Sequence, residues 1–365
     1  MLFLLLLLIL VFCFGLVFFL TKQFGFRGVT YTLAFSEEEV CEGDTVTLTE
    51  TICSRKMLPV PWLKAELTTH SALEFARAQS SISEETRFLS SWYFLRPYRK
   101  IERHWQVKCT KRGVYTVSHA VLVISDLLGT YEASKPFPEA EAHLRVLPAP
   151  IENQAIPSLS SLCMMGETIL ERRFLPDRFA VSGIRAYAEG DNLRDLCQTA
   201  TARMGEPMVY CYQDTADPQI TLLLDLCTKP YDIDRATDRH AYEQAIRLCC
   251  TYILEAQAKN IPISFAANTT LSDAAVQSEK ACGDVHGLRL RRMLAALPDT
   301  IHEPISRMLL RAVSEAYSGV IVLVTANLSE ELIRFAQEYP QLIVVSVRPC
   351  KGDQLSQNVI SASLT

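Results

Sequence analysis

The densest set of side chains that could recognise an anion lies between residues 171 and 203. Arginines and acids alternate along it: Arg172, Arg173, Arg178, Arg185, Arg194 and Arg203 with Glu171, Asp177, Glu189, Asp191 and Asp195. A guanidinium presents a planar fork of N–H donors that fits a carboxylate. This pattern has two interpretations, namely internal ion pairs or a binding surface for an acidic partner. Gly190-Asp191 is typical of a tight turn whose carboxylate caps N–H groups or pairs with an arginine.

A second candidate site lies at the end of a near-continuous apolar run, Gln219–Asp225, which is typical of a buried parallel strand. Ligands of open α/β sheets bind beyond the carboxyl ends of the strands. A hard divalent ion such as Mg²⁺ prefers oxygen donors, whereas Cys227 and Lys229 stand at the next two alternate positions. The sequence therefore predicts a degenerate metal position with no bound metal or other cofactor. An ion pair between Asp225 and Lys229 is an alternative role for this carboxylate.

The twelve cysteines raise a third possibility, a nucleophilic thiol. Their spacing fits neither a disulfide framework nor a CxxC metal site and is typical of reduced, buried thiols. An enzyme would pair Cys197, Cys211 or Cys227 with His240 or His286. No Walker A, GxGxxG, HExxH or GxSxG motif is present. A formal charge of −5 is also unlike the basic character of most nucleic-acid binders, so we expect neither catalysis nor nucleic-acid binding.

The elements that position the second site alternate between strands and helices. Strands are predicted at Gln219–Asp225, Ile261–Ala267, Val320–Thr325 and Leu342–Val347, and helices at Asp238–Lys259, Gly287–Leu297, Ile305–Ala316 and Ser329–Tyr339. The first helix carries apolar residues at i, i+3, i+4 and i+7, and the strands are near-continuous apolar runs. This alternation predicts a doubly wound α/β domain over residues 205–365.

The first half reads differently, because its apolar residues alternate with polar ones. Short strands are predicted at Val29–Phe35, Asp44–Ile52, Trp62–Leu67, Phe88–Leu95, Ile101–Cys109, Val114–Ile124 and His143–Leu147. Their number and their regular turn signals predict an all-β immunoglobulin-like sandwich over residues 28–150. Residues 151–204 are predicted to form a linker and the arginine-rich segment.

The chain begins with an apolar run. Met1–Leu20 contains no charged residue and is long enough to cross a hydrocarbon core of about 30 Å. No basic residue precedes the run and no small-residue cleavage site follows it, which favours an anchor over a signal peptide. Lys22 and Arg27 follow it, and positive charge stays on the cytoplasmic side. The sequence predicts a transmembrane helix over residues 1–22, in the cell membrane, with a cytoplasmic globular part.

Several motifs together resemble a known family. Arg185-x-Tyr187-x-x-Gly190-Asp191-x-x-Arg194, then Ala202-Arg203 and an apolar strand ending in Asp225, resembles the bacterial domain-of-unknown-function 58 family. Gly43-Asp44, Leu58-Pro-Val-Pro-Trp62, Arg112-Gly113-Val-Tyr115 and Asp126-Leu-Leu-Gly129 are similar to its N-terminal sandwich. The resemblance covers nearly the whole chain. This chain departs from the family pattern at two places. Leu196-Cys197-Gln198 stands where the family has Ile-Asp-Trp, and Ala326-Asn327 stands where an acidic residue is expected.

The resemblance implies a membrane anchor, a β-sandwich and a von Willebrand factor A-like domain. Family members are often encoded beside AAA+ ATPases of the MoxR type and other membrane proteins, and no established reaction comes with the family. We therefore expect a membrane-anchored, non-enzymatic interaction or scaffold protein that works with such an ATPase in assembly or maturation of cell-envelope proteins. The alternatives are a metal-dependent adhesion-type binder and the cysteine-based enzyme.

Overall fold

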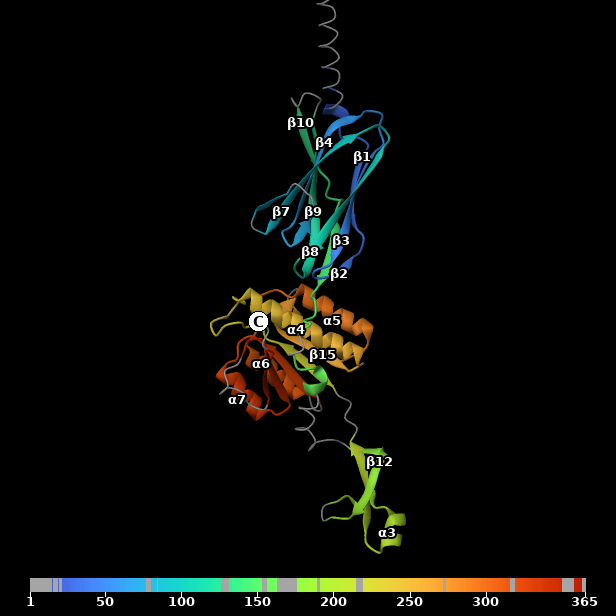
Figure 1. The fold of residues 1–365 in the computed structure, drawn as a ribbon, viewed down its shortest axis with the longest axis vertical. Coiled ribbons are helices and arrows are strands. Elements are labelled where there is room, and N and C mark those ends of the chain that lie inside the picture. The colour runs from blue at the N-terminus through green and yellow to red at the C-terminus, as the bar shows by residue number, and fades with distance from the viewer. Residues whose placement is uncertain are drawn as a thin grey trace, which may run out of the picture. The chain divides into compact units, whose positions relative to one another are not determined.

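The structure is a computed structural model of the chain and describes residues 15, 19, 22–76, 80–83, 85–125, 131–152, 156–162, 176–188, 191–214, 219–271, 274–315, 319–349 and 358–362. It divides into two compact units (Figure 1). One comprises Met1–Ala149 with Arg291–Leu297, and the other Pro150–Leu290 with Pro298–Thr365. Among the described helices, none combines the length and apolarity needed to cross a bilayer. The predicted span, Met1–Leu20, lies almost wholly outside the described residues.

The first unit is a β-sandwich, which confirms the predicted all-β architecture. Its strands are β1 (Val29–Phe35), β2 (Glu39–Cys41), β3 (Thr45–Ser54), β4 (Val60–His70), β5 (Leu73–Phe75), β6 (Ser80–Ser83), β7 (Thr86–Leu95), β8 (Lys100–Cys109), β9 (Gly113–Ser125), β10 (Glu132–Pro136) and β11 (Ala142–Leu147). One sheet has the order β1-β3-β8-β5 and the other β2-β11-β9-β4-β7-β6, with β10 paired to β9. Only the β2–β11 pair is parallel among these described strands.

Period-two alternation explains why these segments form a sandwich. In β3 the residues Val46, Leu48 and Ile52 are buried while the intervening threonines are partly exposed. The inward side chains of both sheets form one core, since a strand places successive side chains on opposite faces. The sequence did not predict β2, β5, β6 or β10. The first three have only three or four residues, too short for alternation to be recognised.

A carboxylate occupies one of the inward positions of β3. Glu50 is 1% exposed and accepts hydrogen bonds from the Tyr31 hydroxyl at 2.8 Å, the Tyr93 hydroxyl at 2.5 Å and the Trp105 indole N–H at 3.0 Å. Burial, reinforced by the Glu50 carboxylate, raises the pKa of both tyrosines. The Arg103 guanidinium lies 4.2 Å from the Trp105 ring centroid. Three aromatic donors thus satisfy a buried acid in the middle of the core.

The second unit contains a sheet flanked by helices. The elements from residue 176 onward are β12 (Pro176–Ala186), η1 (Leu193–Asp195), α3 (Gln198–Met204), β13 (Met208–Asp214), β14 (Ile220–Leu224), α4 (Arg239–Ala258), β15 (Ile263–Leu271), β16 (Ala274–Gln277), α5 (Asp284–Ala296), α6 (Ile305–Glu315), β17 (Val320–Thr325), α7 (Glu330–Glu338), β18 (Leu342–Ser346) and β19 (Val359–Ser361). Residues 291–296 of α5 belong to the first unit and all the other elements to the second. The sheet order is β16-β15-β14-β17-β18-β19. Every pairing in it is parallel except that of β16 with β15.

Both faces of this sheet are covered, which explains its unbroken apolar strands. Leu223, Ile321 and Leu323 pack with residues of α6 and α7. The alternate residues Leu222 and Leu224 are equally buried and point to the other face, and α4 contacts both β14 and β17. The sequence did not predict the edge strands β16 and β19, which have four and three residues.

The arginine-rich segment does not end at residue 204 as predicted. β12 pairs with β13 in an antiparallel register that runs from Pro176↔Asp214 to Ala186↔Met208, with irregularities near Val181. The helix α3 lies between these strands, and its last turn is closed by Gly205, whose φ of 77° favours glycine. The segment and the first residues assigned to the α/β domain are therefore one β-α-β structure, because a strand needs its partner to satisfy its backbone groups.

Candidate functional site

Asp225 stands at the switch point of the parallel sheet. β14 lies between β15 and β17, and the chain leaves β14 and β17 toward opposite edges of the sheet, which is where open α/β sheets bind ligands. Asp225 is 2% exposed. Its Oδ1 accepts from the Cys227 N–H at 3.0 Å and from Asn268 Nδ2 at 2.9 Å, and its Oδ2 accepts from the Thr325 hydroxyl at 2.9 Å.

The surroundings of Asp225 are neutral donors, and this sets its electrostatics. Burial raises the pKa of Asp225 to about 6, and the three donors oppose the rise only in part. The predicted Asp225–Lys229 ion pair is absent among the described residues, because the carboxylate turns inward while Lys229 is exposed. The Lys229 backbone N–H instead donates to Asp232.

The donor set around Asp225 does not fit a hard divalent ion. Such an ion needs several oxygen acceptors, whereas Asp225 faces N–H and O–H donors. Cys227 supplies a thiol that donates to the Lys229 carbonyl at 3.1 Å and accepts from Asn327 Nδ2 at 3.5 Å. In the part of the chain that the structure describes, no three His, Cys, Asp or Glu side chains gather as a metal site would require. The polar side chains at this edge are hydrogen-bonded to one another.

Asp232 closes the loop between β14 and α4. Its carboxylate accepts from the backbone N–H groups of Thr228, Lys229 and Thr237 and from the hydroxyls of Thr228 and Thr237, at 2.5 to 3.2 Å. Partial burial raises the pKa of Asp232, but the hydrogen bonds from Thr228 and Thr237 outweigh it and lower the pKa to about 2. A loop whose N–H groups converge on an internal carboxylate leaves none of those donors for an external anion.

We expect Asp232→Ala to loosen this loop and to destabilise the second unit by about 1–3 kcal/mol, because three backbone donors lose their acceptor. The pH dependence of this stabilisation follows from the lowered pKa of Asp232. The stabilisation is present above pH 4 and is lost as the pH falls toward 2. Hydrogen exchange of the Thr228, Lys229 and Thr237 amides measures the loop directly. Unchanged exchange in Asp232→Ala would contradict this assignment, and Asp234→Ala, an exposed neighbour, is the control.

The arginine-rich segment uses Arg185 internally. Its Nη1 and Nη2 donate to Asp191 Oδ2 and Oδ1, both at 2.7 Å, and the Ala188 N–H donates to Oδ2 at 2.8 Å. These contacts raise the pKa of Arg185 and lower that of Asp191. The Tyr187 N–H donates to the Pro207 carbonyl at 2.9 Å, which ties this turn to β13. Gly190, predicted to belong to it, lies outside the described residues.

Arg194 and Arg203 behave differently from Arg185. Both are exposed, in η1 and in the last turn of α3, and neither guanidinium contacts another described side chain at ion-pair distance. The adjacent Leu193 and Met204 are each 70% exposed. Among those residues of 176–214 whose side chains the structure describes, only Cys197 and Val209 are buried, whereas Val181 and Ile184 are 49% and 45% exposed.

The structure does not bring the predicted cysteine and histidine partners together among the described residues. His286 Nε2 donates to the Ile263 carbonyl at 2.9 Å, and His240 is exposed at the start of α4. Burial raises the pKa of the Cys227 thiol, which disfavours a thiolate. A hydrogen bond with Tyr210 lowers the pKa of Cys197, but this residue is buried. The nine described cysteines are all free thiols.

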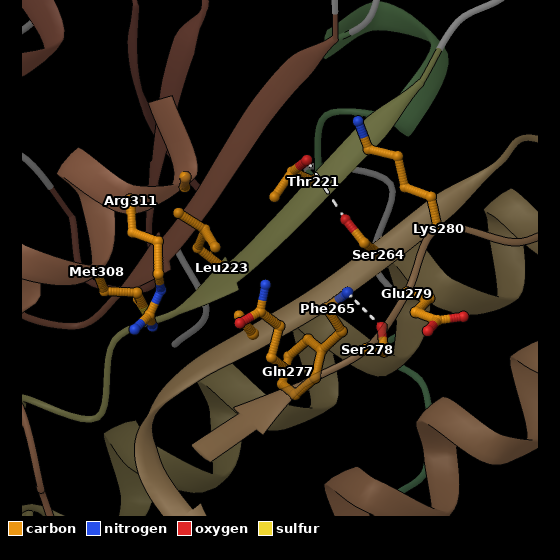
Figure 2. A pocket seen from close by; sticks show the side chains of 12 residues that line it. Thr221, Leu223, Ser264, Phe265, Gln277, Ser278, Glu279, Lys280, Met308 and Arg311 are labelled. Carbon is orange, nitrogen blue, oxygen red and sulfur yellow. Dashed lines mark hydrogen bonds between the residues drawn. The ribbon is translucent and has the colours of Figure 1, made fainter. Parts of the chain in front are cut away.

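A cavity that the sequence did not predict lies on the α6 face of the sheet (Figure 2). It has a volume of about 390 Å³, and its lining comes from β14, β15, β16, the residues after β16, and α6. The Thr221 and Ser264 hydroxyls lie 3.4 Å apart on its floor, and the Ser278 hydroxyl accepts from the Phe265 N–H at 2.8 Å. Arg311 at its rim donates to Glu303 at 2.7 Å. Lys280, the second cation that lines it, donates to Gln219 Oε1 at 3.4 Å. These hydroxyls and both cations are therefore already engaged within the protein.

Of the residues that matter at these sites, sequence reasoning missed Asp232, Asn268, Thr325 and Glu50. Asn268 and Thr325 carried a usable signal, since each is a polar residue at or near the end of an apolar parallel strand. Glu50 also carried one, because it stands at the same parity as Val46, Leu48 and Ile52. Asp232 carried no signal in the sequence, since only the folded loop brings its hydrogen-bond donors to it.

Comparison with known proteins finds matches among solved structures, each over less than half of this chain. No family model and no curated protein sequence matches the chain. A non-cellulosomal cohesin from the archaeon Archaeoglobus fulgidus is 11% identical, covers 32% of this chain and 91% of its own, and gives a TM-score of 0.24. The CARDB domain of the PF1109 protein from Pyrococcus furiosus is 11% identical over 33% of this chain and 90% of its own, with a TM-score of 0.22. Alpha-2-macroglobulin from Escherichia coli is 17% identical over 47% of this chain and 10% of its own, with a TM-score of 0.25.

Proposed function

We propose that this protein is a membrane-anchored interaction or scaffold protein without a reaction of its own, and that its arginine-rich segment binds an acidic partner. The observation that carries the proposal is the contrast between Arg185, which pairs with Asp191, and the exposed Arg194 and Arg203. Guanidinium groups that are not used internally, beside exposed leucine and methionine side chains, have the composition of a recognition surface.

The residues at the carboxyl edge of the parallel sheet support the same proposal, because their polar groups are engaged with one another. In our proposal the second unit is a von Willebrand factor A-like domain whose metal position has become structural. Asp225 takes neutral internal donors and Asp232 fills the neighbouring loop. These contacts disfavour the metal-dependent adhesion-type alternative, and the separation of cysteines from histidines disfavours the cysteine-based enzyme.

The partner that fits best is an AAA+ ATPase of the MoxR type, which the family resemblance implies. Its chemistry would be an acidic surface with an apolar centre, matching Arg194 and Arg203 flanked by Leu193 and Met204. The anchor at residues 1–22 would hold the complex at the cytoplasmic face of the cell membrane, where it would serve assembly or maturation of cell-envelope proteins.

Crosslinking in native membranes, followed by identification of the bound proteins, tests the partner. We expect the double substitution R194E/R203E to weaken binding of the purified ATPase by about tenfold or more, because like charges facing each other across an interface cost several kcal/mol. The melting temperature should change little, since neither arginine forms an ion pair with a side chain that the structure describes. R307E, at another exposed arginine, is the matched control. Equal binding by both variants would remove the segment from the proposal.

A further inference from the structure

At one end of the sandwich the chain enters its first strand, and two short links connect the two sheets. Val29 opens β1 opposite Ser54, and Cys53 of β3 lies opposite Lys100 of β8. In the other sheet Val60 lies opposite Leu95. Residues 55–59 and 96–99 connect the two sheets there. Three segments, 22–28, 55–59 and 96–100, therefore meet at this end, which we call the basic end.

Direct contacts hold these three segments together. Lys56 Nζ donates to the Phe24 carbonyl at 3.0 Å and also to the Gly25 carbonyl, and the Arg55 N–H donates to the Gly28 carbonyl at 2.7 Å. The Tyr98 N–H donates to the Lys56 carbonyl at 3.3 Å. The residues that follow the proposed anchor are thus fixed to the sandwich rather than joined to it by a free linker.

The charge of the basic end has one sign. The three segments carry seven cations and no acidic residue: Lys22, Arg27, Arg55, Lys56, Arg96, Arg99 and Lys100. Lys100 pairs with Glu102 on the strand that follows, and Lys56 is half-buried against carbonyls. Lys22, Arg27, Arg55, Arg96 and Arg99 are exposed, and no described acid forms an ion pair with them. Such a cluster attracts an anionic surface.

Large apolar side chains surround the same end. Met57 and Tyr98 are 80% and 69% exposed on the two links. On the outer face of the sheet, Trp62, Trp92 and Phe94 are exposed near the ends of β4 and β7. They line, with Pro61 and Tyr93, a hollow of about 350 Å³. The Trp62 and Trp92 rings meet edge to face with centroids 6.4 Å apart. We call these five exposed residues, Met57, Trp62, Trp92, Phe94 and Tyr98, the aromatic patch.

We propose that the basic end and the aromatic patch bind the surface of a bilayer that contains anionic phospholipids. Cations beside exposed tryptophan and tyrosine are the composition that proteins place at the membrane–water interface. The inference rests on the proposed anchor at residues 1–22, whose last residue, Lys22, is also the first residue of the basic end. An anchor at this point keeps the patch at the bilayer, so that even weak individual contacts with headgroups are occupied. The sandwich then lies against the membrane in a fixed orientation.

The three tryptophans of the chain give a built-in test, because Trp62 and Trp92 are exposed and Trp105 is buried. The full chain is reconstituted in vesicles whose acyl chains carry bromine, a quencher of indole emission. With phosphatidylglycerol present, we expect the wild-type protein to lose more than about half of its emission, as interfacial indoles contact the acyl boundary. The W62F/W92F variant, which emits only from Trp105, should lose little.

Charge reversal tests whether anionic lipid headgroups contribute to binding or whether the contact is purely apolar. We expect R96E/R99E, and the wild type in pure phosphatidylcholine, to show reduced quenching. K108E/K111E reverses two exposed charges in the stretch where β8 ends and the chain turns toward β9 and should behave as the wild type. Tryptophans that remain unquenched by bromine and accessible to acrylamide would overturn the inference, because both indoles would then lie in water. Equal quenching with R96E/R99E would overturn the anionic headgroup as the ligand.

Flotation of the protein with vesicles tests the lipid-binding patch separately from the proposed anchor. Protein that floats with vesicles in alkaline carbonate but stays unquenched retains the anchor and refutes the lipid-binding patch. Protein that floats only without carbonate, only with anionic vesicles, and is quenched there supports the patch and refutes the anchor.

Discussion

Replacing Glu50 by methionine is expected to lower the free energy of unfolding of the sandwich by about 3–5 kcal/mol, because breaking a buried polar network strands its remaining members. Methionine has a similar length but offers no oxygen, so the Tyr31 and Tyr93 hydroxyls and the Trp105 N–H lose their shared acceptor. The three donors then stay in a core that water does not reach.

All three tryptophans lie in the sandwich, so denaturant unfolding followed by indole emission reports this unit. The decisive comparison adds Tyr31→Phe and Tyr93→Phe to Glu50→Met. Removing the stranded donors should recover about half of the lost stability or more, since removing both members of a buried hydrogen bond is nearly neutral. Glu50→Gln, which keeps one carbonyl oxygen, should fall between wild type and Glu50→Met. A triple variant no more stable than Glu50→Met would show that packing, and not hydrogen bonding, explains the loss.

The second large effect is expected at Asp225, where one substitution should stabilise and another destabilise. The folded-state pKa of about 6 lies above the ordinary value of 3.8, so the folded protein binds this proton more tightly than the unfolded chain does. Stability from this group is therefore complete below pH 4 and is lost as the pH rises to 6. A shift of this size corresponds to about 3 kcal/mol.

Asparagine at position 225 keeps the hydrogen bonds without the buried charge. Its carbonyl oxygen accepts from the Cys227 N–H and Asn268 as Oδ1 does now. Its amide nitrogen faces Thr325, whose hydroxyl is within 3.1 Å of the Asn327 carbonyl and is able to donate there while it accepts. We expect Asp225→Asn to equal the wild type near pH 4 and to exceed its stability at neutral pH by about 1–3 kcal/mol.

Asp225→Ala is the informative contrast, because it removes charge and acceptors together. It should be less stable than Asp225→Asn at every pH by about 2–4 kcal/mol, since three buried donors lose their partner. Far-ultraviolet circular dichroism, to which α4, α6 and α7 contribute, follows unfolding of this unit. A wild-type stability that does not fall between pH 4 and 6 relative to Asp225→Asn would contradict the buried charge. Saturable heat on titration with Mg²⁺ would show that the site binds the ion after all.

Much of the fold follows from the sequence alone. Alternation in Val29–Phe35 and the apolar run at Val320–Thr325 gave strands with the bounds that the structure shows, because side-chain periodicity is a local property. The helix predicted at Asp238–Lys259 begins at Arg239 behind an Asp238 cap and ends at Ala258. The helix predicted at Ser329–Tyr339 is α7, Glu330–Glu338, with Ser329 as its N-cap. The tight turn with Asp191 and an arginine was also readable, since its partners lie six residues apart.

The sites depended on contacts between segments far apart in the chain. Asp225 meets Asn268 and Thr325 across 43 and 100 residues, so periodicity could not indicate that its neighbours would be neutral donors rather than Lys229. The basic end likewise forms only because the links at 55–59 and 96–99 fold beside residues 22–28. Glu50 was visible as a polar residue in an inward position, but its three aromatic donors come from β1, β7 and β8. Sheet order, which long-range pairing decides, brought each of these groups together.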